Sequence, residues 1–394
     1  MDTLLDSQEL EVQRAVRELL EKESPTTLAR SVERVPEGYS TDLWKQLGDL
    51  GWSGLCLPEQ FGGAGMPLWY GGLIAEEVGR HLSPVPYLTT LVASYIVDTF
   101  GTFEQRQRIL PGVAQHQHVL TYAVEERGGL FDPRSVTVTA RREGDGFVVD
   151  GVKRFVDNFG VAQACLVACR VISAAGRDEG VALLLVDPHA PGISTTPLVT
   201  TAKDDERHVS FAGVRVASDA LLGELAQGPR AAATLVDCAS ALLAAQMAGA
   251  ARRVMEVAVA YAKIRHAFGQ PIGAFQSIQH LCADMLIWVD GTELLAREAL
   301  WWIANSTGPR TEASQAKSFA NLRLVPTCRA SQQIHGGMGF TAECEVNLYY
   351  RRVAAWAGRM GNASQHHRRI AADLLDTPGE VRLDAMPPAR NWAA

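Results

Sequence analysis

The sequence is poor in the features that define several common classes of protein. It has only seven cysteines in 394 residues, an odd number, and Cys165 and Cys169 have no second pair at the spacing of a zinc site. The net charge is −7 and no basic stripe stands out, which argues against nucleic acid as a partner. These shortages predict reduced thiols in a cytoplasmic protein, with no metal site.

Targeting segments and long apolar runs are also scarce. The first residues, MDTLLDSQELEVQ, are acidic and amphipathic, and they lack the basic region and the apolar core of a secretory signal. The most apolar stretch, residues 235–251, contains Asp237, Ser240 and Gln246. Because a membrane span tolerates few polar residues, this stretch predicts a buried helix and no membrane partner.

Instead, the sequence contains three segments in which apolar residues recur with different periods. A chain of this length exceeds what one core serves, so two or three domains are expected. Residues 1–118 carry helical patterns, residues 119–222 alternate as strands do, and residues 223–394 return to long helical runs before a loose tail at 378–394. We therefore predict an α+β protein with an N-terminal helical domain, a middle antiparallel β domain and a C-terminal four-helix bundle. Because no Gly-x-Gly-x-x-Gly follows a strand, a Rossmann nucleotide site is not expected.

Two stretches of the last segment have a specific order of residues. One is YAKIRHAFGQPIGAFQSIQHLCADM, residues 261–285, and the other is QQIHGGMGF, residues 332–340. Glycine near a helix costs stability, so three glycines within four residues imply a need for bare backbone. Together with the three-segment layout, both stretches closely resemble the acyl-CoA dehydrogenase family, over essentially the whole chain.

The resemblance implies a fold, a cofactor and a reaction. In that family a helical domain, a β-barrel-like domain and a four-helix bundle usually form tetramers built from dimers. The enzymes bind FAD and oxidise the Cα–Cβ bond of an acyl-CoA thioester, and an electron-transferring flavoprotein is the implied electron acceptor. FAD, an acyl-CoA substrate and that acceptor are therefore the expected ligands and partners of this chain.

Six residues of the two stretches match positions that the family uses for the adenosine half of FAD. They are Arg265, Phe268, Gln276, Gln333, Gly336 and Gly337. Arg265 offers paired donors for phosphate oxygens, Phe268 a face for a ring, and the glycines bare N–H groups for the diphosphate. By the resemblance, this set reaches across a subunit interface and holds the FAD of a neighbouring chain. The structural alternative is that Arg265 caps the end of one helix and the glycines stop another.

The usual catalytic base of the family is missing at both of its places. The reaction needs a group that removes the α-proton while hydride passes to the flavin, and the family uses a glutamate. One place falls on Met360, whose thioether takes no proton at neutral pH, and the other falls on Ala239. Asp237 lies about 200° round the helix from Ala239 and is expected to face elsewhere. Ser240 stands where the family often has an arginine for CoA.

The residues expected to face the flavin ring are altered as well. Where the family has Thr-Glu-Pro-x-x-Gly-Ser-Asp, this chain reads EERGGLFD, which puts Glu125 for threonine and Phe131 for serine. Where the family has Lys-x-Trp-Ile-Thr-Asn, it reads KRFVDN, which puts Phe155 for tryptophan and Asp157 for threonine. Reduced flavin is anionic in these enzymes. Two like charges about 4 Å apart cost roughly 4 kcal/mol at an effective dielectric of about 20, so Glu125 and Asp157 oppose flavin reduction.

This pattern is one-sided. Residues that serve a neighbour's FAD are kept, and residues that serve the chain's own flavin and substrate are changed. We therefore predict a subunit of a heterotetramer that contributes FAD-adenosine contacts and pairs with a catalytic acyl-CoA dehydrogenase chain. The family includes such arrangements in bacteria that degrade steroid side chains.

Three alternatives remain open. A homo-oligomeric dehydrogenase would use Asp237, Asp157 or Glu125 as a displaced base. A flavin-dependent monooxygenase on the same fold needs no α-proton base, although such enzymes do not need the diphosphate-binding set. The third is a scaffold without flavin, and the joint presence of Arg265 and the two glutamines argues against it.

Overall fold

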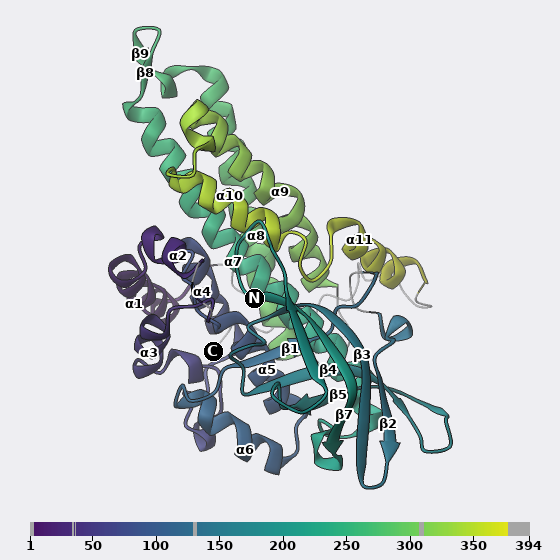
Figure 1. The fold of residues 1–394 in the computed structure, drawn as a ribbon. Coiled ribbons are helices and arrows are strands. Elements are labelled where there is room, and N and C mark those ends of the chain that lie inside the picture. The colour runs from purple at the N-terminus through teal and green to yellow at the C-terminus, as the bar shows by residue number, and fades with distance from the viewer. Residues whose placement is uncertain (1–3, 34, 36, 129–131, 307–310, 377–394) are drawn as a thin grey trace, which may run out of the picture.

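The structure, a computed structural model, has the expected order of helices, sheet and helices (Figure 1). It describes residues 4–33, 35, 37–128, 132–306 and 311–376. Two sequence predictions, the flavin-facing position of Phe131 and the loose tail at 378–394, lie outside these described residues.

Helices make up the first segment. They are α1 (Ser7–Glu23), α2 (Thr26–Val32), α3 (Thr41–Asp49), α4 (Leu68–Arg80), α5 (Tyr87–Phe100) and α6 (Phe103–Ala114). Local sequence signals set several of their starts: Asp6 and Glu9 form a capping box at α1, and the Ser40 hydroxyl accepts from the backbone N–H of Leu43 at α3. Their apolar faces share one core with the bundle.

The middle segment is a twisted sheet. Its strands are β1 (Leu120–Ala123), β2 (Thr139–Glu143), β3 (Gly146–Asp157), β4 (Ala164–Ile172), β5 (Asp178–Val186), β6 (Ile193–Pro197) and β7 (Glu206–Ala217). The order is β1-β4-β2-β3-β7-β6, with β5 also paired to β4. The predicted antiparallel pairing holds for most neighbours, but β1 and β2 each run parallel to β4, because long connections bring the chain back in the same direction.

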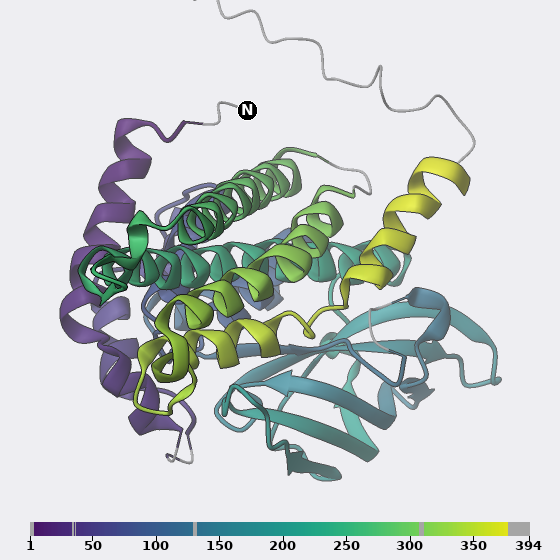
Figure 2. The same ribbon diagram turned by 90° about the horizontal axis from the view of Figure 1, so that it is seen from above.

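The last segment is the predicted four-helix bundle. It consists of α7 (Gly228–Ile264), α8 (Gln276–Asn305), α9 (Glu312–His335) and α10 (Glu345–Trp356), and α11 (Ala363–Ala371) follows it. A small hairpin of β8 (His266–Ala267) and β9 (Gln270–Pro271) joins α7 to α8 at the far end of the bundle (Figure 1). In Figure 2 the sheet lies on the side of α11, and α1 lies on the opposite side. The α+β fold class is thereby confirmed.

The segment boundaries at 118 and 222 remain predictions. In the structure the last helix of the first segment ends at Ala114 and the first strand begins at Leu120. The last strand ends at Ala217, and α7 begins at Gly228.

Two glycines let α4 and α7 approach each other closely. A Cβ atom on Gly79 would lie 1.8 Å from the carbonyl oxygen of Gln246, and a Cβ on Gly249 would lie 1.8 Å from the carbonyl oxygen of Glu76. Side chains at these positions would force the helices apart. The crossing therefore fixes how the first segment sits on the bundle.

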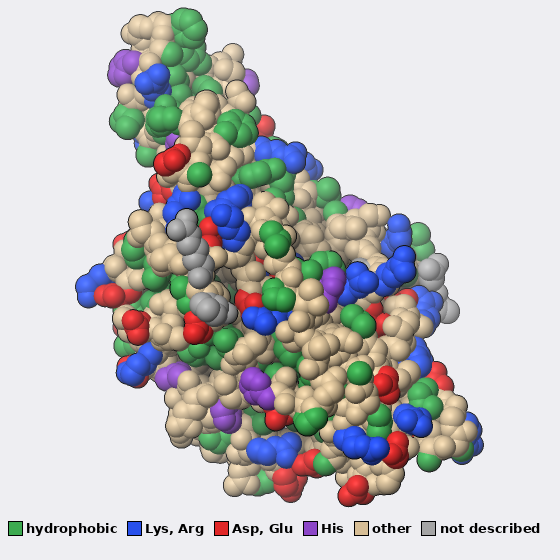
Figure 3. Space-filling model, viewed as in Figure 1, with side chains coloured by type: hydrophobic (Ala, Val, Ile, Leu, Met, Phe, Trp, Pro, Cys, Tyr) green, Lys and Arg blue, Asp and Glu red, His purple; other side chains and the backbone are tan. Residues whose placement is uncertain are grey.

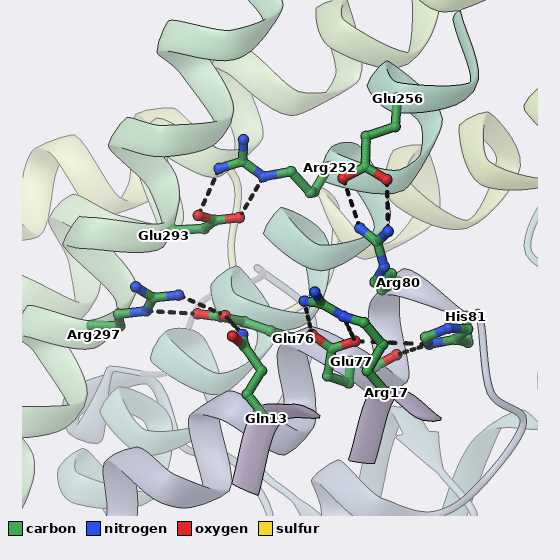
Figure 4. Close-up of polar contacts among 10 residues, drawn as sticks. All are labelled: Gln13, Arg17, Glu76, Glu77, Arg80, His81, Arg252, Glu256, Glu293 and Arg297. Atoms are coloured by element: carbon green, nitrogen blue, oxygen red, sulfur yellow. Dashed lines mark hydrogen bonds and ion pairs between the residues drawn. The ribbon is translucent and has the colours of Figure 1, made fainter. Parts of the chain in front are cut away.

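Paired ions surround this crossing (Figure 4). In each pair two guanidinium N–H groups donate to one carboxylate; the pairs are Arg17–Glu77, Arg80–Glu256, Arg252–Glu293 and Arg297–Glu76. They join α1, α4, α7 and α8. Forked pairing of this kind fixes orientation as well as contact.

Among the described residues, one helical stretch, Leu225–Ile264, is long and apolar enough to cross a membrane. However, 83% of its most apolar window is buried inside the protein. This burial is the packing of a core helix, as the sequence predicted for residues 235–251.

Candidate functional site

A cavity of about 110 Å³ lies where the three segments meet. Glu125 and Asp157 from the middle segment line it, and so does Met360 from the last. The motif resemblance assigns Glu125 and Asp157 to the flavin and Met360 to the place of the base. Glu125 is only 6% exposed, so its carboxylate faces the interior and not solvent. Phe155 lies at the edge of the cavity, half exposed, with its ring 5.8 Å from that of His208.

The backbone of Met360 is held from both sides. Its N–H donates to Glu125 Oε1 at 2.7 Å, and its carbonyl accepts from His366 Nε2 at 2.9 Å. Burial lowers the pKa of His366 to about 3, so the ring is neutral, and Ser314 Oγ lies 3.1 Å from its other nitrogen. These contacts keep Met360 at φ +53°, a conformation that costs a residue with a side chain of order 1–3 kcal/mol. Hydrogen bonds thus fix the backbone of Met360, while its side chain is a buried thioether that accepts no proton.

The second place for a base gives no proton acceptor either. Ala239 is fully buried in the core of the bundle. Asp237 lies 2.6 Å from Arg369 of α11 and lines a different cavity, with Tyr95 and Phe100 of α5. Asp237 therefore faces away from the cavity of Met360, as its helical spacing predicted.

An arginine next to Met360 gathers three carboxylates. Arg359 Nη1 lies 3.2 Å from Asp157 Oδ2, Arg359 Nε lies 2.5 Å from Glu206 Oε1, and the remaining Nη2 pairs with Asp204. We call these four residues the Arg359 cluster. The guanidinium side chain is 13% exposed, so its charge is largely removed from water. This cluster was not predicted from the sequence, in which the acidic run KDDER at 203–207 is its only local sign.

Burial shifts the pKa values around the cavity. It raises the pKa of Glu125 to about 7, and it raises the pKa values of Asp157 and Glu206. Burial also pushes the pKa of Asp204 upward, but Arg359 and then Arg352 outweigh it and hold that pKa below its ordinary value. The acidic groups in and around the cavity therefore differ in pKa, with some raised and one lowered.

Lys317 and Lys153 are further buried cations near these groups. Burial lowers the pKa of Lys317 to about 7, and its Nζ donates to Asn321 Oδ1 at 2.6 Å and to the carbonyl of Trp356 at 3.0 Å. Lys153 Nζ donates to Glu126 Oε1 at 2.6 Å, which ties β3 to the loop after β1. The two lysines are fully buried and act as internal braces.

The six residues assigned to a neighbour's FAD lie far from this cavity, at the hairpin end of the bundle. Arg265 ends α7, Phe268 lies in the hairpin and is 95% exposed, and Gln276 begins α8. Gln333 and Gly336 lie at the end of α9. Figure 3 shows hydrophobic side chains, green, gathered at this end of the molecule. We call this set of six residues the bundle tip.

Packing beneath the surface brings the two stretches of the bundle tip together. Ile334 belongs to one small apolar cluster with Ala262 and Met285, and Ile272 packs on it. The rings of Tyr261 and His335 stack at 4.4 Å. Arg265, Gln276 and Gln333 are thereby held at one surface, with their side chains exposed.

The glycines of the tip face open space. A Cβ placed on Gly336 or Gly337 would meet no atom of the described chain within 4 Å, whereas a Cβ on Gly339 would lie 2.6 Å from the carbonyl of Gln332. Gly339 therefore serves the fold of this chain. The structure offers no internal packing reason for Gly337, and Gly336 has the positive φ of +61° that favours glycine.

Family models match the chain along nearly all of its length. The N-terminal domain of acyl-CoA dehydrogenases matches residues 6–117, the middle domain residues 121–214, and the C-terminal domain residues 226–375. The chain belongs to the acyl-CoA dehydrogenase family. Members of this family are FAD-dependent oxidoreductases, and the recognition made from the two stretches is confirmed.

Individual relatives agree with this assignment. FadE12 of Mycobacterium tuberculosis, an acyl-CoA dehydrogenase, is 31% identical over 78% of this chain and 81% of its own. Among solved structures, the Tcur3481-Tcur3483 steroid ACAD is 31% identical with a TM-score of 0.84, covering 92% of this chain and 96% of that chain. The ChsE4-ChsE5 complex from Mycobacterium tuberculosis is 25% identical with a TM-score of 0.87, covering 96% and 100%.

The two ends of the site differ in how they suit FAD. Pockets that hold organic cofactors typically enclose about 300–1,000 Å³, whereas the cavity around Met360 encloses about 110 Å³. It is lined by Glu125, Asp157 and Asp204, an acidic set that does not suit an anionic reduced flavin. The bundle tip, by contrast, exposes a cation, an aromatic ring, two amides and bare glycines. This donor set fits the phosphates and the adenosine of an FAD held mainly by another chain.

Proposed function

We propose that this acyl-CoA dehydrogenase chain is the non-catalytic subunit of a heteromeric enzyme. What supports this most is Met360, at the place of the family's glutamate, with its backbone held by Glu125 and His366 and with no group that accepts a proton. The cavity around it is lined by acidic side chains and, at about 110 Å³, is smaller than the pockets that typically hold organic cofactors. On this proposal the chemistry takes place in a neighbouring chain.

The bundle tip is the part of this chain that contributes to that chemistry. When bound in the neighbour, FAD would supply the acceptor for the hydride that leaves the β-carbon of the acyl-CoA. Arg265 would pair with phosphate oxygens of that FAD, Phe268 would offer its ring face, and the amides of Gln276 and Gln333 would hydrogen-bond to it. The N–H groups at Gly336 and Gly337 receive the diphosphate, and their open surroundings support this role.

The partner is a catalytic acyl-CoA dehydrogenase chain that carries the glutamate. Support comes from two similar structures, the ChsE4-ChsE5 complex and the Tcur3481-Tcur3483 steroid ACAD, which are named as pairs of chains. By analogy with the latter, we propose that the substrate class is a steroid whose side chain carries the acyl-CoA thioester. The same proposal includes an electron-transferring flavoprotein as the electron acceptor and a cytoplasmic location.

The experiment that tests the proposal is anaerobic flavin reduction. The full chain, purified alone and supplied with FAD, is mixed with a panel of acyl-CoA thioesters while the absorbance of oxidised flavin is followed. We expect no bleaching by the chain alone and bleaching once a co-purified catalytic chain is present. Bleaching by this chain alone would overturn the proposal.

One observation favours a second candidate, a homo-oligomeric dehydrogenase with Glu125 as a displaced base. Glu125 lines the cavity, and burial raises its pKa to about 7, where a general base is effective. In that case the chain alone would bleach flavin, and Glu125→Gln would abolish the bleaching. Asp237 is disfavoured as a base because it faces another cavity.

A further inference from the structure

The Arg359 cluster joins the sheet of the middle segment to the bundle. Arg359 lies just after α10, Asp157 ends β3, and Glu206 begins β7. Asp204 lies in the connection before β7 and also faces Arg352 of α10 at 4.0 Å. The cluster therefore spans the boundary between the sheet and the bundle.

A second set of pairs extends this link to the first segment. Glu33, directly after α2, lies 2.8 Å from Arg351 and 3.8 Å from Arg352. Lys203 lies 3.4 Å from the other oxygen of Glu33. Ion pairs thus tie all three segments of the chain together.

We propose that the Arg359 cluster takes the place of the flavin ring in this chain. The cluster closes the space that a flavin ring would occupy between the sheet and the bundle, here called the ring space, and it links these two parts without a cofactor. This inference rests on the proposed function, because it treats the cavity of Met360 as a site that the chain itself does not use. The inference adds that the ion pairs of the Arg359 cluster close this site, in addition to the absence of a catalytic base.

The charges explain why the cluster would both persist and exclude a flavin. One guanidinium faces three carboxylates, so the loss of Arg359 would remove the cation that pairs with Asp157 and Glu206 and would leave Asp204 facing Arg352. The same excess of carboxylates, with Glu125 beside them, opposes an anionic reduced flavin. Opening the ring space would require that Asp157 and Glu206 give up their partner.

Hydrogen–deuterium exchange of the full chain tests the link, with Arg297→Gln as a matched control. Arg297 is also a largely buried arginine, but it pairs with Glu76 and joins α8 to α4. We expect Arg359→Gln to raise exchange in peptides of β3 and β7 by at least about tenfold, with α4 unchanged. Arg297→Gln should loosen α4 and leave β3 and β7 unchanged. Equal exchange of β3 and β7 in wild type and Arg359→Gln would overturn the proposal.

Adding FAD tests the closure of the ring space by the same measurement. We expect saturating FAD to leave exchange of β3 and β7 unchanged in the wild-type chain. Protection of these strands would mean that a flavin ring enters the cavity, and the proposal would fail while the absence of bleaching still upheld the proposed function. If Arg359→Gln is recovered only unfolded, Arg359→Lys keeps the charge but loses the forked donors, and it should show a smaller rise in β3 and β7.

Discussion

The carboxylate of Glu125 accepts a hydrogen bond of 2.7 Å from the backbone N–H of Met360, 235 residues away in the sequence. The motif resemblance predicts that each of these residues stands where the acyl-CoA dehydrogenase family has a residue that serves flavin or substrate. In this chain the two altered positions bind each other. The contact thus joins the middle segment to the last one at the cavity.

Glu125 should make the stability of the chain depend on pH. Its pKa is raised from 4.5 to about 7 on folding, because burial disfavours the ionised form. The stability contributed by the protonated carboxyl is therefore fully present below pH 4.5 and is lost as the pH rises to about 7. Relative to Glu125→Gln, the wild-type free energy of unfolding should fall by about 3 kcal/mol across this window and stay level above it. Urea unfolding of both proteins between pH 4.5 and 8 measures this, and parallel curves would refute it.

Replacing Met360 with glutamate should not create a working dehydrogenase. The Met360 side chain is 5% exposed, and a new carboxylate there would lie near Glu125 in a small cavity. We expect Met360→Glu to destabilise the fold by about 2–4 kcal/mol and to give no flavin bleaching with acyl-CoA. Met360→Gln, similar in size but uncharged, is the control for thermal unfolding. Bleaching by the glutamate variant would show that a missing base was the chain's sole defect.

Arg265→Ala should weaken FAD binding by the assembled enzyme without affecting this chain's fold. A charge-assisted, paired contact to phosphate contributes roughly 1.5–3 kcal/mol, so the loss of affinity should be about 10- to 100-fold. The control is Lys263→Ala, which removes an exposed cation two residues away. Titration of FAD into the complex with a catalytic chain measures both. Equal losses for the two variants would mean that Arg265 acts only through its general charge.

Two neighbouring glycines should respond differently to alanine. A Cβ on Gly337 meets nothing within 4 Å in the described chain, so Gly337→Ala should change the chain's stability by less than about 0.5 kcal/mol. If that glycine receives a diphosphate, the same change should lower FAD affinity of the complex about tenfold. Gly339→Ala would place a Cβ 2.6 Å from the carbonyl of Gln332 and should cost this chain about 1–3 kcal/mol. Thermal unfolding and FAD titration separate the two effects, and unchanged FAD binding by Gly337→Ala would count against the bundle-tip assignment.

Much of the fold could be predicted because it depends on local signals. The change from a helical to an alternating pattern near Leu120 and back near Gly228 reflects side-chain periods that neighbouring residues set. The parallel pairing of β1 and β2 with β4 could not be read in this way. Pairing direction depends on how long connections return through space, and periodicity carries no record of that path.

The features of the candidate site also divide into those that the sequence predicts and those that it does not. The motif order around Arg265 and Gly336 and the methionine at 360 were readable by counting residues, and counting also showed that Asp237 turns away from Ala239. The Arg359 cluster was not readable. Arg359 and Asp157 are 202 residues apart, and nothing near either one indicates the other.

The sequence by itself determined the order of the three segments, the family, and the identity of the residues at the bundle tip and at the place of the base. Only the tertiary structure decided that the cavity around Met360 is small and is lined by paired charges, Arg359 with Asp157 and Asp204. The reason is physical: a period or motif is written in consecutive residues, whereas a buried charge is tolerated only where packing brings distant partners to it.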